Sequence, residues 1–328
     1  MQTRLGFTLM TLAEFEGWIR ARQVARTVLT LQQHHTLAPS YGSFNGRNHF
    51  ELQSGMKQYH VVHNGWGDIG QHFTTFPDGT IMTGRPLEQS PACIKGNNQS
   101  SLCIENLGNF DQARDTMSAE HRATIVGMAA IICKRFAIPV NVDRVVYHHW
   151  FHLDTGARTN GGAGTKSCPG SAFFGGNTVE NAQRSFLPLV RRAMGGAEAA
   201  IPAPAPAGML YACVQTDRLN VRSAPSATAP KINTVTLGSV LRVHDERDGW
   251  LKISSSQDEW VSAKLTQPVE RATVNTDTLN VRNGPAPTFD KLAALARKQE
   301  VFVYERNAGW CRISLEPRWV SEKLLTLG

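Results

Sequence analysis

Side chains that bind metals in proteins gather in the first 195 residues of this chain. Adjacent histidines occur at residues 34–35 and again at residues 148–149, and Cys168 ends the glycine-containing stretch GAGTKSCPG, residues 162–170. Imidazole nitrogen and thiolate sulfur are usual ligands of zinc, and a lone thiolate beside two imidazoles favours a metal without redox chemistry over iron or copper. These residues therefore predict a zinc site with two nitrogen ligands and one sulfur ligand.

A strand and a hairpin are expected to position the first of these groups. The sequence TVLTLQQ predicts a strand over residues 27–33, which brings His34 and His35 to its end. The stretches QHFTTF and TIMTGR flank the turn sequence Pro-Asp-Gly at residues 77–79, and this pattern predicts a β-hairpin.

A further strand and a helix follow along the chain. Alternation over residues 102–105 places Cys103 and Glu105 on one face of a strand, where Glu105 is either solvated or directed into a cleft. After Ser118, a residue type that caps helix N-termini, the sequence predicts a helix that packs on the sheet. The apolar stripe of this helix consists of Ile125, Met128, Ile132 and Phe136.

The chain divides into a large first domain and a tandem repeat. Residues 195–208, GGAEAAIPAPAPAG, predict an extended linker that follows a domain of residues 1–194. TDRLNVRSAP recurs as TDTLNVRNGP, and WVSAKL recurs as WVSEKL, so that residues 209–268 and 269–328 form two copies. Each copy alternates apolar and polar residues between turn residues, which indicates a small all-β barrel.

Composition limits the partners and the compartment. The 328 residues are 41% hydrophobic, which is enough for a buried core, and the net charge of +7 favours an anionic polymer such as nucleic acid, acidic lipid or cell wall. The N-terminal apolar run is too short for a signal peptide, and no segment is long and apolar enough to cross a bilayer. We therefore expect cytoplasmic synthesis, and in that reducing compartment all six cysteines are expected to be free thiols.

Both copies of the repeat resemble bacterial SH3-like domains. The resemblance rests on LNVR-x-[AG]-P, a central Gly-Trp pair and a closing WVS-x-KL. It implies attachment to cell-wall peptidoglycan, although such barrels also serve as protein-interaction modules. Most of the tryptophans in the repeats are expected to lie in the barrel cores.

The first domain resembles the zinc-dependent N-acetylmuramoyl-L-alanine amidases, a family that includes phage lysozyme-amidases and peptidoglycan recognition proteins. The motifs HHT, GW-x-DIG-x-HF, FPDGTI, SLCIENLGN, YHH and TKSCPG carry this resemblance, in that order, over roughly residues 25–175. The resemblance implies an α/β fold with a mixed central sheet flanked by helices, followed by the two small barrels. It also implies one zinc ion per chain bound by His34, His148 and Cys168, with Lys166 stabilising an oxyanion.

Two positions decide which side chain acts as the base. Many relatives have a tyrosine where this chain has Gln71, before the His-Phe of the DIG motif, so a mechanism assisted by a phenol is in doubt here. Other relatives have a glutamate at the position of Glu105. We therefore expect Glu105 to activate zinc-bound water, because a carboxylate in a partly dry cleft has a raised pKa.

The spacing before the last ligand leaves alternatives open. Twenty residues separate His148 from Cys168, so His149 or His152 could replace His148 as a ligand. Cys93, in SPACIKGNN, is expected to be a buried or half-buried thiol, or to line the cleft.

The expected activity is hydrolysis of the amide bond between N-acetylmuramic acid and L-alanine of the peptidoglycan stem peptide. A zinc endopeptidase that cuts within the stem peptide and a non-catalytic peptidoglycan recognition protein are the alternatives, and the complete zinc set argues against the second. Peptidoglycan is the expected partner of both the catalytic domain and the barrels, with no nucleic-acid partner. The enzyme is expected to act on the cell wall or periplasmic peptidoglycan after release or delivery, as a phage endolysin or an antibacterial effector, with a recycling enzyme as a further possibility.

Overall fold

The computed structural model describes residues 1–22, 24–195, 210–255 and 257–328. The predicted linker, residues 195–208, lies outside the described residues except for Gly195. The chain forms two compact units, the first from Met1–Arg22, Val28–Leu87 and Pro91–Pro202, and the second from Gln23–Thr27, Glu88–Ser90 and Ala203–Gly328. The second unit therefore takes in two short segments from the N-terminal part of the chain.

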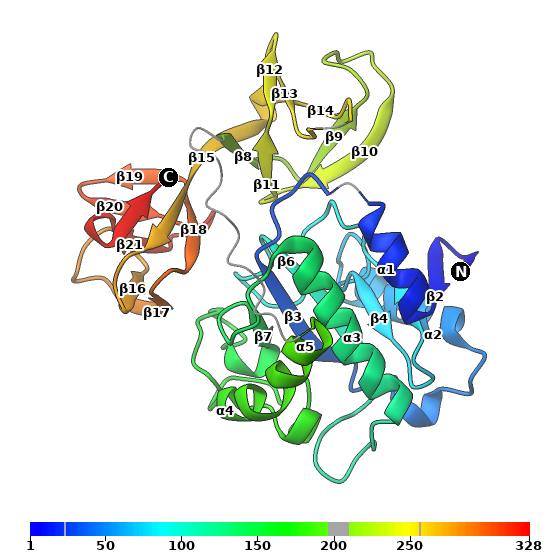
Figure 1. Ribbon diagram of the computed structural model, residues 1–328. Coiled ribbons are helices and arrows are strands. Elements are labelled where there is room, and N and C mark those ends of the chain that lie inside the picture. The colour runs from blue at the N-terminus through cyan, green and yellow to red at the C-terminus, as the bar shows by residue number, and fades with distance from the viewer. Residues whose placement is uncertain (23, 196–209, 256) are drawn as a thin grey trace. The chain divides into compact units, whose positions relative to one another are not determined.

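A seven-stranded mixed sheet forms the centre of the first unit (Figure 1). In spatial order its strands are β1 (Gln2–Arg4), β2 (Phe7–Met10), β5 (Ile81–Thr83), β4 (Phe73–Thr75), β6 (Ser101–Asn106), β3 (Thr30–His35) and β7 (Val145–Tyr147). β4, β6, β3 and β7 run parallel to one another, whereas the pairs β1–β2, β2–β5 and β5–β4 are antiparallel. This is the mixed sheet expected from the sequence.

The predicted hairpin and strands form, with small shifts of their ends. β4 and β5 are the two arms of the hairpin. β3 begins at Thr30 and includes both His34 and His35, so the strand ends later than predicted. The reason is the neighbouring strand, because β6 continues the parallel ladder as far as the pairs His34–Glu105 and His35–Asn106.

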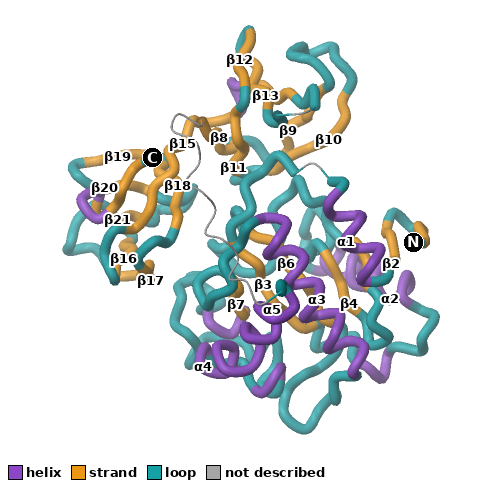
Figure 2. The backbone as a smooth tube through the Cα atoms, in the orientation of Figure 1, coloured by secondary structure: helices purple, strands orange, loops and turns teal. Residues whose placement is uncertain are grey.

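Helices cover the sheet (Figure 2). The α-helices are α1 (Leu12–Arg20), α2 (His49–Gln58), α3 (Ala119–Phe136), α4 (Val179–Asn181) and α5 (Leu187–Ala193). Single π-helical turns span Tyr59–His63 and Ala182–Phe186, and short 3-10 helices span Tyr41–Ser43, His148–Trp150, Phe173–Gly175, Ala263–Leu265 and Glu322–Leu324. Among the described residues, no helix is long and apolar enough to cross a membrane.

The sequence signals of α3 are confirmed in detail. The Ser118 side chain accepts a hydrogen bond from the backbone N–H of His121 and caps the helix N-terminus. Three members of the predicted apolar stripe, Ile125, Met128 and Ile132, are fully buried, and the fourth, Phe136, is half-buried near the helix end. In Figure 1, α3 and α5 lie over one face of the sheet. The opposite face therefore remains for the loops that carry the site.

The second unit repeats one arrangement of strands. The first copy contains β8 (Leu210–Val214), β9 (Arg218–Arg222), β10 (Lys231–Thr236), β11 (Val240–Val243), β12 (Asp245–Arg247), β13 (Trp250–Lys252) and β14 (Trp260–Ser262). The second contains β16 (Thr278–Arg282), β17 (Lys291–Ala296), β18 (Glu300–Val303), β19 (Glu305–Asn307), β20 (Trp310–Arg312), β21 (Trp319–Ser321) and β22 (Leu325–Leu327). The strand order β10-β9-β14-β13-β12 recurs as β17-β16-β21-β20-β19, as the sequence repeat requires.

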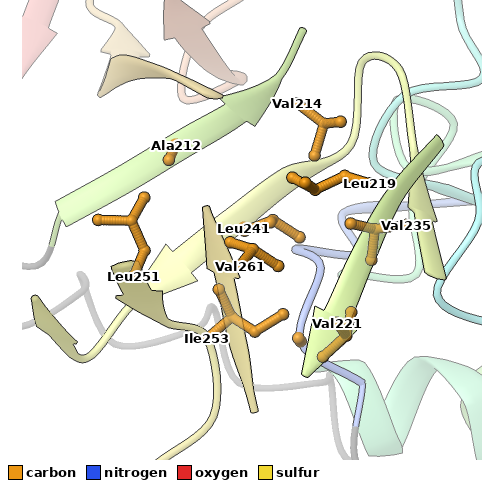
Figure 3. Close-up of a cluster of buried hydrophobic side chains, with 10 residues drawn as sticks. Ala212, Val214, Leu219, Val221, Val235, Leu241, Leu251, Ile253 and Val261 are labelled. Carbon is orange, nitrogen blue, oxygen red and sulfur yellow. The ribbon is translucent and has the colours of Figure 1, made fainter. Parts of the chain in front are cut away.

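One long strand, β15 (Thr266–Val274), joins the two copies without a linker. Its first half pairs with β8 of the first copy, and its second half pairs with β18 and β22 of the second. Each copy nevertheless has its own apolar core; Figure 3 shows that of the first copy, which also includes Ala25. Trp260 and Trp319 are buried, whereas Trp250 and Trp310 are half-buried.

Candidate metal centre

The register of the central strands places the site residues on one face of the sheet. His34 on β3 lies beside Glu105 on β6, and Glu105 lies beside Thr74 on β4. Paired residues on neighbouring strands point to the same face, as do residues two apart on one strand. His34 and Glu105 therefore share a face with Cys103, which precedes Glu105 by two positions.

Two loops bring the remaining groups to His34. β7 leads directly into the short helix that begins with His148, and the loop that follows returns to Cys168. The backbone N–H of His35 lies 3.4 Å from the Cys168 sulfur and donates to it, and the N–H of His149 donates to the Cys168 carbonyl at 2.7 Å. The Cys168–Pro169 peptide bond is cis.

The distances from His34 to the other two ligand atoms match those of a tetrahedral zinc site. His34 Nδ1 lies 3.2 Å from His148 Nδ1 and 3.5 Å from Cys168 Sγ. Zinc–nitrogen bonds of about 2.0–2.1 Å and a zinc–sulfur bond of about 2.3 Å give tetrahedral edges of roughly 3.3 Å and 3.5 Å. These residues therefore fit a zinc ion, and three protein ligands leave a fourth position for water or substrate.

The protonation states of the two imidazoles suit metal binding at the same point. Burial, followed by smaller effects of the Lys166 ammonium and of His35, lowers the pKa of His148 to about 3, and burial holds the pKa of His34 well below its ordinary value. Both imidazoles are thus neutral, the form that binds metals. Burial and then the Glu105 carboxylate raise the pKa of the Cys168 thiol, and a bound cation would reverse this effect by stabilising the thiolate.

Glu105 has the environment expected of a general base. The residue is half-buried, but its Oε2 atom is buried and has no hydrogen-bond partner among the described residues. Burial raises the pKa of Glu105 to about 8, against the opposing effect of the Lys166 ammonium. Lys166 itself is exposed, and its charge acts on Glu105, His34 and His148 alike. The structure therefore brings all five predicted site residues into one neighbourhood.

The loop before Cys168 holds the two competing histidines away from the site. His149 Nδ1 lies 2.6 Å from the Lys166 carbonyl oxygen, and His152 Nδ1 accepts the N–H of Asp154. Gly161 and Gly164 have positive φ angles, and a side chain at either position would collide with the ring of His149 or His152. These glycines make room for the two imidazoles. His149 and His152, the alternatives to His148, therefore make contacts within the loop instead.

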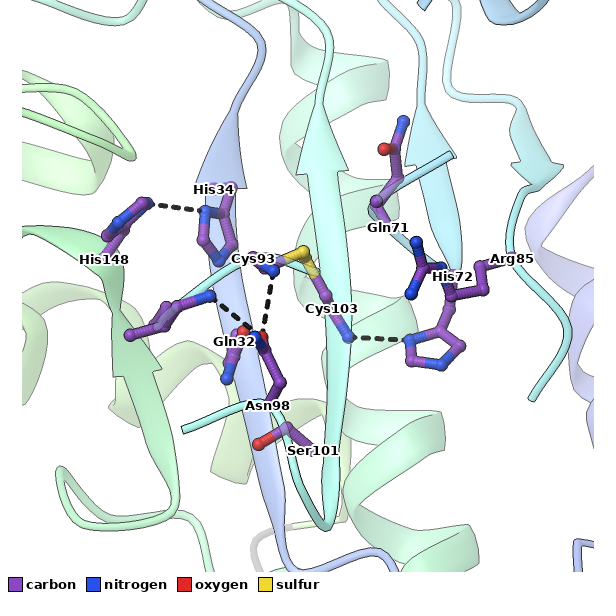
Figure 4. The surroundings of a disulfide bond; sticks show 12 residues. Gln32, His34, Gln71, His72, Arg85, Cys93, Asn98, Ser101, Cys103 and His148 are labelled. Atoms are coloured by element: carbon purple, nitrogen blue, oxygen red, sulfur yellow. Dashed lines mark hydrogen bonds between the residues drawn. A yellow bond between two sulfur atoms is a disulfide. The ribbon is translucent and has the colours of Figure 1, made fainter. Parts of the chain in front are cut away.

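Gln71 lies apart from the ligands. Its side chain is buried and donates to Thr74 Oγ1 at 3.0 Å. Figure 4 shows it on the far side of β6 from His34. Gln71 is therefore placed to contact the site only through Thr74, the neighbour of Glu105.

Sequence reasoning missed the residues that anchor the Cys168 loop. Asp111 accepts hydrogen bonds from Ser167 Oγ and from the backbone N–H of Ser171, both at 2.9 Å. Asn177 donates to the Ser167 carbonyl at 2.7 Å and accepts from the indole of Trp150 at the same distance. No local sequence pattern marks these two residues. Asp111 binds a segment more than fifty positions away, and Asn177 binds an irregular turn.

The expectation that all six cysteines are free thiols is wrong. Cys93 and Cys103 form a disulfide, so Cys93 is not the thiol predicted from the sequence. Cys103 is fully buried on β6, and the segment that contains Cys93 folds over the same face of the sheet (Figure 4). The expectation rested on the compartment alone, whereas the pairing follows from tertiary contact. The other four cysteines, Cys133, Cys168, Cys213 and Cys311, are free and buried.

Comparison with protein families agrees with this geometry. Residues 25–171 match the N-acetylmuramoyl-L-alanine amidase family. Residues 217–267 match the bacterial SH3 domain, a match that covers the first copy of the repeat. The amidase region contains every residue of the candidate metal centre.

Curated relatives share parts of the amidase region. The chain is 25% identical over 132 residues to the provisional N-acetylmuramoyl-L-alanine amidase YrvJ of Bacillus subtilis (strain 168), covering 36% of this chain and 26% of that protein. It is 30% identical over 89 residues to an N-acetylmuramoyl-L-alanine amidase of Homo sapiens, covering 27% of this chain and 16% of that protein. The chain thus spans about a quarter or less of these relatives.

Two solved structures, one of a Drosophila PGRP and one of a Clostridium amidase, are weakly similar to this chain. Drosophila PGRP-LB is 18% identical with a TM-score of 0.35, over 49% of this chain and 83% of that chain. The N-acetylmuramoyl-L-alanine amidase LysC from Clostridium intestinale URNW is 18% identical with a TM-score of 0.34, over 49% of this chain and 86% of that chain.

Proposed function

We propose that this protein is a zinc-dependent peptidoglycan hydrolase that cleaves the amide bond between N-acetylmuramic acid and L-alanine. The observation that carries the proposal is the tetrahedral spacing of His34, His148 and Cys168 beside Glu105, within a region that matches the amidase family. One zinc ion per chain would be held by these three residues. The chemistry that zinc supplies at such sites is Lewis-acid activation of a carbonyl and of water.

The roles of the other residues follow from their surroundings. Glu105 Oε2 has no competing partner among the described residues, so it accepts the proton of the attacking water and delivers it to the leaving nitrogen of L-alanine. Lys166 is exposed at the rim of the ligand set, and its ammonium stabilises the negative charge that grows on the carbonyl oxygen during attack. An ammonium beside a cation is favourable only when such charge develops.

The repeats supply a second interaction with the same polymer. We assign residues 1–194 to the catalytic domain, residues 209–268 and 269–328 to two SH3-like domains, and residues 195–208 to the linker. The match of the first copy and the recurring strand order of the second support two domains of one kind. Both would bind the cell wall and raise the local concentration of substrate. The proposal includes cytoplasmic synthesis followed by action on the cell wall after release or delivery.

Digestion of purified sacculi tests the activity. Mass spectrometry of the soluble products should show new L-alanine amino termini and intact glycan strands. New termini within the stem peptide would instead identify an endopeptidase, and intact sacculi after binding would identify a recognition protein. Either result would overturn the amidase proposal.

Replacement of the sulfur ligand tests the zinc site. With the Cys93–Cys103 disulfide intact, Cys168→Ser should lose most of the bound zinc after gel filtration, because a hydroxyl is a far weaker ligand than a thiolate. Cys133→Ala, which removes a buried free thiol from α3, is the matched control and should keep one zinc per chain. Full zinc content in oxidised Cys168→Ser would remove this residue from the ligand set.

A further inference from the structure

The disulfide lies directly beside a residue of the candidate metal centre. Cys103 and His34 share a face of the sheet, because Cys103 pairs with Gln32 on β3, two positions before His34. A ring nitrogen of His34 and the sulfurs of Cys93 and Cys103 all lie within 4.8 Å of one another. The ligand atoms of His34, His148 and Cys168 satisfy the same limit, so His34 belongs to two groups of potential ligands among the described residues.

Both cysteines are held in place by contacts that do not depend on the disulfide. The backbone N–H groups of Cys93 and Ile94 donate to Asn98 Oδ1 at 2.9 and 3.0 Å. The N–H of Cys103 donates to His72 Nδ1 at 3.1 Å, within the ladder region of β6 (Figure 4). None of these hydrogen bonds involves a sulfur atom, so reduction leaves their donors and acceptors in place and the two thiols would stay close to His34.

The segment around Cys93 is also tied to the sheet. Asn97 accepts two hydrogen bonds at its carbonyl, from Gln32 Nε2 at 2.8 Å and from Ser101 Oγ at 2.7 Å. Its own amide donates to the Gly156 carbonyl at 2.8 Å. Reduction would therefore release two sulfurs from one another without releasing the segment from β3.

The Cα separation suits a pair of metal ligands. The Cα atoms of Cys93 and Cys103 are 6.7 Å apart. Two sulfurs that share a tetrahedral zinc ion are about 3.8 Å apart, because each zinc–sulfur bond is about 2.3 Å. Reduction breaks the bond that holds the sulfurs at the shorter disulfide distance, and rotation of the two side chains then brings them to this spacing. The sulfurs of the intact disulfide carry no thiolate, so only the reduced pair can act as ligands.

We propose that the reduced thiols of Cys93 and Cys103 form, with His34, a second zinc site that competes with the catalytic one. This inference rests on the proposed function for the identity of the competing site. Both sites use the His34 imidazole, so zinc bound at one site weakens binding at the other. Two thiolates and one imidazole are softer ligands than one thiolate and two imidazoles, and soft ligands favour zinc retention. In the reduced protein, zinc would thus be held away from His148 and Cys168.

Electrons and protons balance in the reduction and oxidation of the Cys93–Cys103 pair. A dithiol reductant donates two electrons and two protons, its own sulfurs become a disulfide, and Cys93 and Cys103 become thiols. Zinc binding then displaces the thiol protons. A disulfide oxidant reverses the exchange, accepts the two electrons and returns His34 to the catalytic group. The hydrolase would be inactive in a thiol-rich compartment and active in an oxidising one.

Sulfur coordination of zinc in the full chain gives the direct test. X-ray absorption of the zinc-loaded wild-type protein should show one sulfur ligand in the oxidised form and two after reduction by a phosphine, which competes little for zinc. One sulfur ligand in both states would overturn the proposal. This measurement needs no variant and therefore does not depend on the folding of one.

Two variants separate the sites. Cys168→Ser should bind almost no zinc when oxidised and one zinc per chain when reduced, because only the second site remains. The Cys93→Ser/Cys103→Ser double variant should hold zinc through one sulfur under both conditions. Absence of zinc from the oxidised wild type would refute the proposed function itself. Zinc in the wild type, without uptake by reduced Cys168→Ser, would refute only the second site.

Discussion

His34 is shared by both groups of potential metal ligands among the described residues. It lies on a central strand rather than on a loop, so its ring is positioned by the ladder between β3 and β6. Its neighbours are Glu105 on the next strand, His148 and Cys168 on loops, and the disulfide on the same face. A ligand on a central strand, with its partners on anchored loops to one side, suits a site that must hold a metal and admit a polymer.

Glu105→Gln tests the assignment of the base. The amide keeps the size of the side chain but cannot accept a proton at neutral pH, so turnover should fall by about 10²–10⁴-fold, the usual contribution of general acid–base catalysis. Zinc content and melting temperature should stay near wild-type values, because Glu105 is not in the ligand set. Rates on a soluble muropeptide are the measurement.

Glu120→Gln provides the matched control for this change. Glu120 is exposed in the first turn of α3, and its replacement should leave the rate unchanged. An undiminished rate in Glu105→Gln would assign proton transfer to another group. Gln71 donates to Thr74, the neighbour of Glu105, and a glutamine side chain has no group that titrates at neutral pH.

At the level of the elements, α3 is joined to the sheet by a buried polar network. His121 on α3 contacts Tyr41 Oη through Nδ1 at 2.8 Å and Thr75 Oγ1 on β4 through Nε2 at 2.7 Å. Thr75 donates onward to Asn106, and Tyr41 Oη accepts the N–H of Ser118. Thr75 thus accepts from His121 Nε2–H, and Nδ1 accepts from Tyr41. This pattern uses a neutral imidazole.

The network predicts loss of stability in acid. Burial lowers the pKa of His121 to about 3 from an ordinary value of 6.5. Between pH 6.5 and pH 3, His121 is therefore protonated in the unfolded chain but neutral in the folded chain. Stability falls as the pH drops through this range. Below pH 6.5, each pH unit lowers the free energy of unfolding by about 1.4 kcal/mol for one such histidine. The unfolding free energy should therefore fall by ~2 kcal/mol between pH 6.5 and pH 5. Urea unfolding at the two pH values measures this change.

His121→Gln is the comparison that isolates the effect. Glutamine can donate to Thr75 but does not titrate, so the variant should be less stable at neutral pH and lose less stability in acid. The remaining acid dependence, from groups such as His148, is common to both proteins. Equal losses in the two proteins would show that His121 does not govern the acid response.

At the level of the whole molecule, the strand β15 makes the two repeats one continuous structure. Its two halves pair with strands of different copies, so a continuous strand rather than a flexible linker joins the two copies. The second unit also takes in residues 24–27, and Ala25 lies in the core of the first copy. Removal of the whole repeat therefore also removes the surroundings of Ala25.

Truncation should separate targeting from chemistry. A chain that ends at residue 196 should keep its rate on soluble muropeptides but bind whole sacculi more weakly, because tethering by the repeats is lost. Pull-down with sacculi and rates on a soluble fragment are the two measurements. A melting curve of the truncated protein checks that loss of the core around Ala25 has not unfolded it.

A second truncation, which keeps one copy of the repeat, should bind sacculi with intermediate strength. A chain that ends at residue 269 keeps the first copy and the half of β15 that pairs with β8. Its binding to sacculi should lie between that of the full chain and that of the shorter truncation. If all three proteins bind and lyse sacculi equally, the repeats are not cell-wall anchors and an interaction-module role is favoured.

Much of this protein was determined by the sequence itself. The repeat, the hairpin and the apolar stripe and cap of α3 are properties of residues close together in the chain, and local periodicity and turn chemistry specify them. The motifs around His34, Glu105 and Cys168 also identified side chains that the structure brings together. Local pattern sufficed because each motif occupies the end of a strand or a loop beside one.

Tertiary structure alone decided which groups face one another. The position of His148 beside His34, with His149 and His152 held elsewhere, depends on how the loop folds around two glycines, and the Cys93–Cys103 bond depends on a segment folded across β6. Asp111 and Asn177 act on the Cys168 loop from elsewhere in the chain. These contacts join residues that are distant in sequence. Strand register and loop closure set their distances, and neither is visible in the order of residues.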